Sequence, residues 1–361
     1  MTAELRRGPN AGSNDGRSND NGAPVDGVTF RLCADLEAEL PALFAVQDAA
    51  RIADGEVERN SLQGFSNYYR HLERCDPARD LLIAEHDGRV VAYARVEWND
   101  SNDGERWYEA VGIVRPEWRR RGIGRRLLAW SETRRTEIAA GHAAAGEAPD
   151  RTRALTTFIF DRDVGGRVLL ERAGYTSFRR FASMRRADVD DIPVTPLPDG
   201  LETRPIGRDR AALRQVFDAD VEAFRDHFGW SEGTDEAFEE FIGYDNVDPA
   251  LWVVAFDRDE VAGAVLAGIH VDADDERSGW LDSIFTRRPW RQRGLARALI
   301  GRSLVVLREA GMTSASLGVD LTNPHQALAL YESCGFATVS SSTAYRKPFP
   351  APSSEPEERS R

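Results

Sequence analysis

The sequence predicts an α/β protein built from two copies of one fold. Four sequence segments occur twice in the same order, and each copy mixes strand-like and helix-like patterns. The stretch DDIPVTPLPDG at 190–200 has the composition of a linker. We therefore expect a first copy at 27–189 and a second copy at 201–347. The tails at 1–26 and 348–361 have few large apolar residues and are expected to be disordered.

Each copy opens with a short strand-like segment followed by a helical pattern. The strand-like segments are VTFRL at 28–32 and LETRPI at 201–206, and the helical patterns cover 36–50 and 211–224. A β-hairpin pattern comes next, at 81–97 and at 251–269, with its turn at an Asp/Gly or Asp/Arg/Asp cluster. The order strand, helix, hairpin is therefore the same in both copies.

The third repeated segment joins a strand to a helix through an arginine-rich loop. It reads VGIVRPEWRRRGIGRRLLAW at 111–130 and SIFTRRPWRQRGLARALI at 283–300. A helix N-terminus offers unpaired N–H groups, and small residues there let an anion approach the backbone. One such loop could be a solvated helix start, but two in equivalent places predict phosphate sites. The fourth pair is ERAGY at 171–175 and ESCGF at 332–336, and the extra stretch at 141–150 predicts a surface loop.

These motifs resemble the GCN5-related N-acetyltransferase (GNAT) family. The loop pattern Arg-x-x-Gly-x-Gly/Ala is similar to that family's coenzyme A loop, and LGVDLTNPHQALALYESCGF at 317–336 is similar to its later strand and helix. The resemblance covers nearly all of 28–347, and the duplication is similar to that of mycothiol synthase-type members. It implies two tandem domains, each with a mixed, mostly antiparallel sheet flanked by helices. It also implies transfer of acetyl from acetyl-CoA to a primary amine of an unidentified acceptor.

The same resemblance assigns residues to the coenzyme. Pantetheine would pair with the strand before each loop, the pyrophosphate would lie on the loop, and a backbone N–H near Phe285 would hold the oxyanion. In the second copy the implied residues are Ile284, Phe285, Thr286, Arg291, Gln292, Arg293, Gly294, Leu295, Ala296, Arg297 and Asn323. In the first copy they are Ile113, Val114, Arg119, Arg121, Gly122, Ile123 and Gly124.

The catalytic residues that the resemblance implies lie in the second copy. Tyr331 matches the tyrosine that protonates the departing thiolate, although it could instead be a helix residue packed on Phe336. Asp282, on the strand, is the candidate general base, or else a strand-end carboxylate paired with an arginine. His227 is a second candidate base. Asn323 either contacts pantetheine or only caps the next helix.

The first copy departs from this pattern. Counted from the glycine of the fourth repeat, Leu170 stands where the second copy has Tyr331, and Arg162 where it has Asn323. Counted from the loop, Ala110 stands where the second copy has Asp282. We therefore expect the first copy to bind coenzyme A or to serve as structure, without turnover.

Composition narrows the remaining possibilities. The formal net charge of −13 argues against nucleic acid or anionic membrane as partners, and the six histidines and three cysteines have no metal-ligand spacing, so no metal is expected. No apolar run could span a bilayer, and the odd, scattered cysteines favour a reducing cytoplasm. A monomer is preferred, because the duplication can replace a dimer. The alternatives are a non-catalytic acyl-CoA-binding or regulatory protein, and a protein acetyltransferase acting on lysines or N-termini.

Overall fold

The computed structural model describes residues 25–56, 61–72, 74–101, 104–225, 233–243, 247–269, 278–322 and 327–349. Most of both predicted tails therefore lies outside the described residues. The predicted linker at 190–200 forms neither helix nor strand. No helix in the described part of the chain is both long enough and apolar enough to cross a membrane.

Helices and strands alternate along both copies. The helices are α1 (Leu36–Asp54), α2 (Leu62–Arg70), α3 (Pro77–Asp80), α4 (Ile123–Ala144), α5 (Val164–Arg172), α6 (Arg210–Phe224), α7 (Asp235–Gly243), α8 (Leu295–Glu309) and α9 (Ala327–Ser333). The strands are β1 (Thr29–Leu32), β2 (Leu81–His86), β3 (Arg89–Asp100), β4 (Glu105–Val114), β5 (Thr152–Phe160), β6 (Thr176–Arg186), β7 (Glu202–Arg204), β8 (Val253–Asp257), β9 (Glu260–Ile269), β10 (Ser278–Thr286), β11 (Ser314–Asp320) and β12 (Ala337–Pro348).

Local chemistry explains the repeated starts and turns. Asp35 and Asp209 each cap the first helix of their copy, because each side chain accepts a hydrogen bond from a backbone N–H in the first turn. Asp87 and Gly88 both have positive φ and form the predicted turn between β2 and β3. The predicted loop at 141–150 is wrong in its first part, because α4 continues to Ala144.

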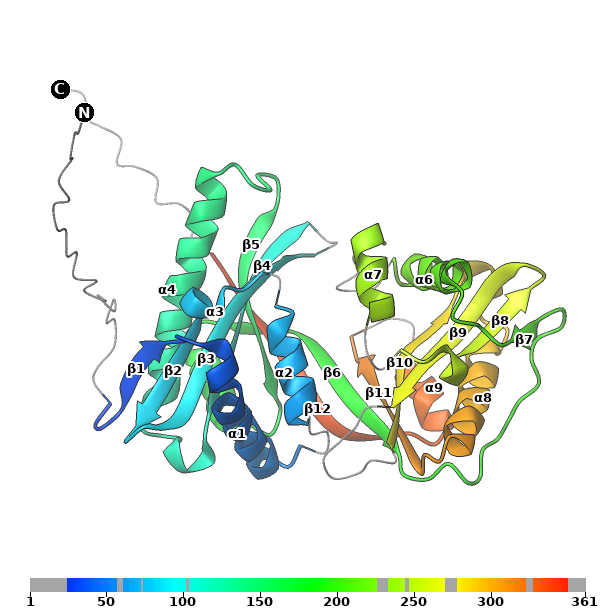
Figure 1. Cartoon of the computed structure of the whole chain (residues 1–361), viewed down its shortest axis with the longest axis horizontal. Helices are drawn as coiled ribbons and strands as arrows, with labels where there is room; N and C mark the ends of the chain where they lie inside the picture. The colour runs from blue at the N-terminus through cyan, green and yellow to red at the C-terminus, as the bar shows by residue number, and fades with distance from the viewer. Residues whose placement is uncertain are drawn as a thin grey trace, which may run out of the picture.

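The described strands form one twelve-stranded sheet in the order β1-β2-β3-β4-β5-β12-β6-β11-β10-β9-β8-β7 (Figure 1). Most neighbours are antiparallel, and β4–β5 and β10–β11 are parallel. The sheet is therefore mixed and mostly antiparallel, as expected. In each copy the helices cover both faces: α1 and α2 lie opposite α4, and α6 and α7 lie opposite α8 and α9, each group over its own apolar cluster.

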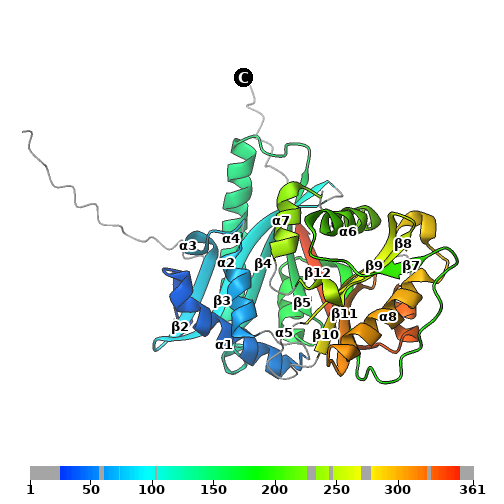
Figure 2. The same cartoon turned by 45° about the vertical axis from the view of Figure 1, so that its right-hand side comes forward.

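The two copies exchange their last strands. β12, from the end of the second copy, pairs with β5 of the first copy, and β6, from the end of the first copy, pairs with β11 of the second. β6 and β12 also pair with each other, so they form the centre of the sheet between the two halves (Figure 1). Figure 2 shows β12, in red, from a second direction. The sheet thus does not divide at the predicted linker, although 27–189 and 201–347 remain the predicted domain boundaries along the chain.

The strand exchange makes the core of the first copy depend on the end of the chain. Tyr345 on β12 is buried among Tyr108, Leu155, Leu170 and Tyr175 of the first copy. We expect Tyr345→Ala to destabilise that region by about 3–5 kcal/mol, because it removes a buried aromatic ring. Amide hydrogen exchange should then speed up in β5 and α5 more than in α6 and β8.

The matched control for this prediction is Phe336→Ala. Phe336 is equally a residue of the second copy but is buried in the core beneath α8. Its loss should speed exchange in α8 and β11. The same exchange pattern in both variants would contradict a core shared through β12.

Candidate functional site

The site in the second copy begins where β10 leaves β11. The parallel pairing of these strands extends from Ser278–Ser314 to Trp280–Ser316 and then stops. From Leu281 to Thr286, β10 keeps its antiparallel pairing with β9 on its other side. The edge of β10 that faces β11 therefore has backbone groups with no ladder partner in the described chain. Such an edge can pair with an extended ligand.

A β-bulge at Asp282 marks this point. The register with β9 shifts between Leu281 and Ser283, and Asp282 is the extra, exposed residue. A regular strand would place Leu281 and Ser283 on the same face. The bulge reverses the alternation instead, so Leu281 packs beneath α8 while Ser283 faces α6. The strand also needs a glycine beside it, because a Cβ on Gly263 would lie 2.6 Å from the carbonyl oxygen of Phe285.

The loop after β10 leads into an open helix N-terminus. Gly294 precedes α8 with a φ of 83°, no side chain caps the first turn, and no atom lies within 4 Å of the position that a Cβ would take. Gln292 also has positive φ, at 60°. Gln292, Arg293 and Arg297 are exposed around this end of the helix. The arrangement offers backbone N–H groups and two guanidinium groups to an anion.

Several residues predicted to bind the coenzyme can contribute only backbone groups or support. Arg291 donates to the carbonyl oxygens of Thr286 and Ala223, both at 3.0 Å, and so ties the loop to β10 and α6. The side chains of Phe285 and Leu295 are buried, while Ile284 and Ala296 are half-buried. The hydroxyl oxygen of Thr286 is buried without a hydrogen-bond partner in the described structure. Thr286 is the last residue of β10, and a buried hydroxyl without a partner is a group that a bound ligand could satisfy.

Tyr331 lies on α9, on the α8 side of the sheet. Its side chain is 8% exposed and belongs to the core with Leu295 and Phe336. Burial raises the pKa of Tyr331 to about 12, so the phenol stays protonated at neutral pH. Its ring centroid is 6.5 Å from that of Phe336, and its hydroxyl has no partner among the described residues. Asn323 and His227 lie outside the described residues.

The first copy has the same loop but a tighter strand pair. Arg120 and Gly122 repeat the positive φ values of Gln292 and Gly294, at 65° and 92°. No side chain caps the helix behind Gly122, and the Ile123 side chain is buried. The parallel pairing of β4 and β5 continues to Ala110–Thr157, whereas that of β10 and β11 ends at Trp280–Ser316, and β4 has no bulge against β3.

Two arginine side chains of the first copy also tie its loop and the end of β5 to the end of α1. Arg119 forms an ion pair with Asp54 at the end of α1 and donates to the Val114 carbonyl oxygen. Arg162, from the turn after β5, donates to the carbonyl oxygen of Gly55. These bonds join α1, the loop and the end of β5. Arg121 stacks on the Trp118 ring, and the side chains of Ile113 and Val114 pack against the apolar clusters on either face of β4. Gly124 is half-buried, and Leu170 is buried in the shared core.

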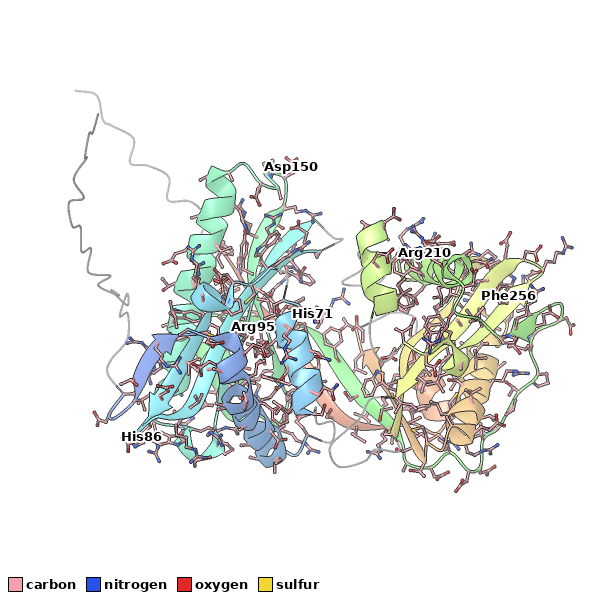
Figure 3. All side chains as sticks on the ribbon, in the orientation of Figure 1. His71, His86, Arg95, Asp150, Arg210 and Phe256 are labelled. Carbon is pink, nitrogen blue, oxygen red and sulfur yellow. The ribbon has the colours of Figure 1, made fainter. Side chains whose placement is uncertain are left out.

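The first copy nevertheless holds a cluster of charged residues that the sequence pattern did not predict. Glu97 on β3 lies directly opposite Glu109 on β4. Arg95 forms an ion pair with Glu97 and donates to the Tyr68 hydroxyl at 3.0 Å, which places it beside α2 (Figure 3). Burial, with the charge of Glu97, raises the pKa of Glu109 to about 7. Two glutamates on different strands carry no sequence spacing that could have revealed the cluster.

Comparison with known proteins gives the two copies a common family. Residues 47–155 and 213–336 match the acetyltransferase (GNAT) family. Mycothiol acetyltransferase of Geodermatophilus obscurus is 30% identical over 318 residues, which covers 86% of this chain and 94% of that protein. Mycothiol acetyltransferase of Parafrankia sp. is 27% identical over 332 residues, covering 86% and 95%.

Solved structures show the same architecture. A GCN5-related N-acetyltransferase from Sphaerobacter thermophilus superposes with a TM-score of 0.71 at 24% identity, covering 90% of this chain and 96% of that one. A tandem GNAT protein from the clavulanic acid biosynthesis pathway has a TM-score of 0.64 at 18% identity, covering 90% and 100%. At these identities the likeness concerns the fold.

The raised pKa of Glu109 has a consequence for stability. A carboxyl whose pKa is higher in the folded than in the unfolded protein loses stability as pH rises from about 4.5 to about 7. Glu109→Gln removes that loss, so the free energy of unfolding should rise by about 1–3 kcal/mol at pH 8 and change little at pH 4. Urea unfolding at the two pH values measures this. The control is Glu117→Gln, whose carboxylate is exposed and paired with Arg89. If the Glu109 variant gains no stability at pH 8 relative to pH 4, Glu109 is not the titrating group.

Proposed function

Because the chain belongs to the acetyltransferase (GNAT) family and is an N-acetyltransferase, we propose that its second copy transfers acetyl from acetyl-CoA to a primary amine. One observation carries this assignment. Among the described residues, only the second copy combines a strand pair that separates at a bulge, an open Arg–Gly loop and a tyrosine on the helix after the second parallel strand, α9.

The coenzyme would bind mainly through the backbone. Pantetheine would pair with the free edge of β10 from Ile284 to Thr286, and the hydroxyl of Thr286 would gain the partner it lacks. The pyrophosphate would lie on the N–H groups at Gly294 and the start of α8, with Arg293 and Arg297 beside it. This mode of binding explains why buried side chains such as Leu295 are compatible with the site. Asn323 stays a predicted pantetheine contact.

The chemistry would be direct attack of a neutral amine on the thioester carbonyl. A backbone N–H near Phe285 would stabilise the oxyanion. As the C–S bond breaks, Tyr331 would supply a proton to the departing sulfur, which its protonated state at neutral pH allows. Asp282 is exposed at the bulge and remains the predicted proton acceptor on the strand itself.

The names of the relatives support a proposal for the acceptor class. Two of the similar chains are mycothiol acetyltransferases, so we propose an amine of the mycothiol type as acceptor. A monomer in the cytoplasm stays the prediction from the duplication and the scattered cysteines. Assays with a mycothiol-related amine, a simple amino sugar and a lysine peptide, read by mass spectrometry, test this class. Acetylation of the lysine peptide alone would instead favour a protein acetyltransferase. Acetyl-CoA binding without any turnover would favour a regulatory binding protein.

Coenzyme binding can be tested with matched variants of the two loops. Gly294→Glu and Gly122→Glu place the same carboxylate at equivalent positions with similar positive φ, so backbone strain is matched. We expect calorimetry to find one acetyl-CoA site per wild-type chain, lost in Gly294→Glu and kept in Gly122→Glu. In the first copy the parallel strands stay paired to Ala110–Thr157, and Arg119 and Arg162 tie the loop and the end of β5 to α1. Two sites in the wild type would mean that the first copy also binds the coenzyme. No site at all would contradict acetyl-CoA as donor.

The role of Tyr331 has its own test. Tyr331→Phe should lower kcat by about 100-fold while leaving the Kd for acetyl-CoA unchanged, because only the proton donor is lost. Tyr345→Phe is the control, since it removes a buried hydroxyl far from the loop of the second copy. Equal kcat values for Tyr331→Phe and the wild type would mean that another group protonates the thiolate.

A further inference from the structure

A carboxylate on α6 faces the bulge of β10. The Ser283 hydroxyl donates a hydrogen bond to Asp220, which lies 63 residues earlier in the chain. Asp220 is half-buried on the helix face that packs against β9 and β10, beside Val216, Ala219 and Ala223. The contact between the two residues depends on the bulge, because only the reversed alternation of β10 turns Ser283 toward α6. None of the steps proposed above uses this pair.

The Asp220 carboxylate has no cationic partner among the described residues. Burial raises the pKa of Asp220 to about 6, and the hydrogen bond from Ser283 opposes that rise. Its charged neighbours along α6 already have partners, because Asp218 is paired with Arg214 and Glu222 with Arg287. On the sheet side, β9 presents apolar side chains to this face. Asp282 lies beside Ser283 at the bulge. Asp220 itself has no ion pair among the described residues, so at neutral pH it is a carboxylate without a cation.

The first copy lacks both members of the pair. The buried residues Leu213, Val216, Ala219 and Ala223 of α6 correspond to Leu40, Leu43, Val46 and Ala50 of α1. In this alignment of the helices, Gln47 is the equivalent of Asp220. In the alignment of the two loops, Val111 is the equivalent of Ser283. Gln47 cannot accept a proton at neutral pH, and Val111 cannot donate a hydrogen bond. The pair therefore occurs only in the copy that also has the tyrosine.

We infer that Asp220 binds the ammonium group of the acceptor and accepts its proton, and that Ser283 positions the carboxylate. This inference rests on the proposed function of the second copy and names its proton acceptor on α6 instead of Asp282. Asp220 borders the α6 side of β10, whereas Tyr331 belongs to the core on the α8 side. The amine would thus arrive on one face of the sheet and the thiolate would be protonated from the other.

The proton and electron balance is simple. One proton of the ammonium passes to Asp220 and then to solvent, which leaves a neutral amine. The nitrogen lone pair forms the C–N bond, the C–S bond breaks, and its electron pair stays on sulfur. Tyr331 protonates that sulfur and regains a proton from the second N–H of the attacking nitrogen. The products are the amide and coenzyme A, with one proton released.

The decisive experiment compares Asp220→Asn with Asp218→Asn between pH 5 and pH 9, using the amine that the wild type acetylates best. Asn keeps an oxygen that accepts the Ser283 hydrogen bond, and Asp218 is an exposed residue on the same helix. We expect Asp220→Asn to lower kcat/KM by about 100-fold and to abolish the rise in activity near pH 6. Its Kd for acetyl-CoA should equal that of the wild type, and Asp218→Asn should resemble the wild type throughout.

Two further readouts separate catalysis from structure. Ser283→Ala removes the bond that lowers the pKa of Asp220, so the acid limb should move to higher pH. Asp220→Asn should have a Tm at pH 8 no lower than that of the wild type, because a buried carboxylate with a raised pKa destabilises the fold when ionised. A lowered Tm together with lost activity would overturn the inference in favour of a structural role.

The failures of the two proposals are also distinct. If Asp220→Asn keeps the wild-type kcat/KM and pH profile, or only Asp282→Asn removes the acid limb, the inference is wrong while the proposed function stands. If the wild type acetylates no amine in the panel, the proposed function fails. Calorimetry of the same amines at pH 7.5 then decides: weaker binding to Asp220→Asn supports an ammonium site, and equal binding or none overturns it.

Discussion

The bulge at Asp282 is the constraint on which the site of the second copy depends. One extra residue reverses the side-chain alternation of β10, which buries Leu281 beneath α8 and turns Ser283 toward α6. At the same place β10 stops pairing with β11. A single backbone irregularity therefore opens the strand edge and orients the polar pair beside it. The first copy has no bulge between β3 and β4, and its parallel strands stay paired as far as Ala110–Thr157.

The two copies have kept the fold and diverged in side chains. Both have an Arg–Gly loop in which the two equivalent residues have similar positive φ values. They differ in what surrounds it. Arg162 and Arg119 connect the loop region of the first copy to the end of α1, and Leu170 fills the place of the tyrosine. The corresponding arginine of the second copy, Arg291, supports its loop through backbone carbonyls and leaves the helix end exposed.

The exchange of β6 and β12 joins these copies into one continuous sheet. Each copy completes its sheet with the last strand of the other, so the core of the first copy contains Tyr345 from the end of the chain. Strand pairing across the centre buries the edges that two separate domains would expose. The arrangement also explains how a first copy without an equivalent of Tyr331 can persist, because the second copy cannot complete its sheet without β6.

The sequence by itself determined the duplication, the α/β class and both Arg–Gly loops, because each is written in a local pattern that recurs at a fixed place. Tyr331 occurs in one copy alone and was a candidate through the family resemblance of its segment. Helix caps at Asp35 and Asp209 and the turn at Asp87-Gly88 are local for the same reason. Only the tertiary structure decided the exchange of β12, the bulge at Asp282 and the contact between Ser283 and Asp220. Those features depend on which strands pair and in which register, and pairing energies between segments far apart in the chain leave no periodic signal in either segment.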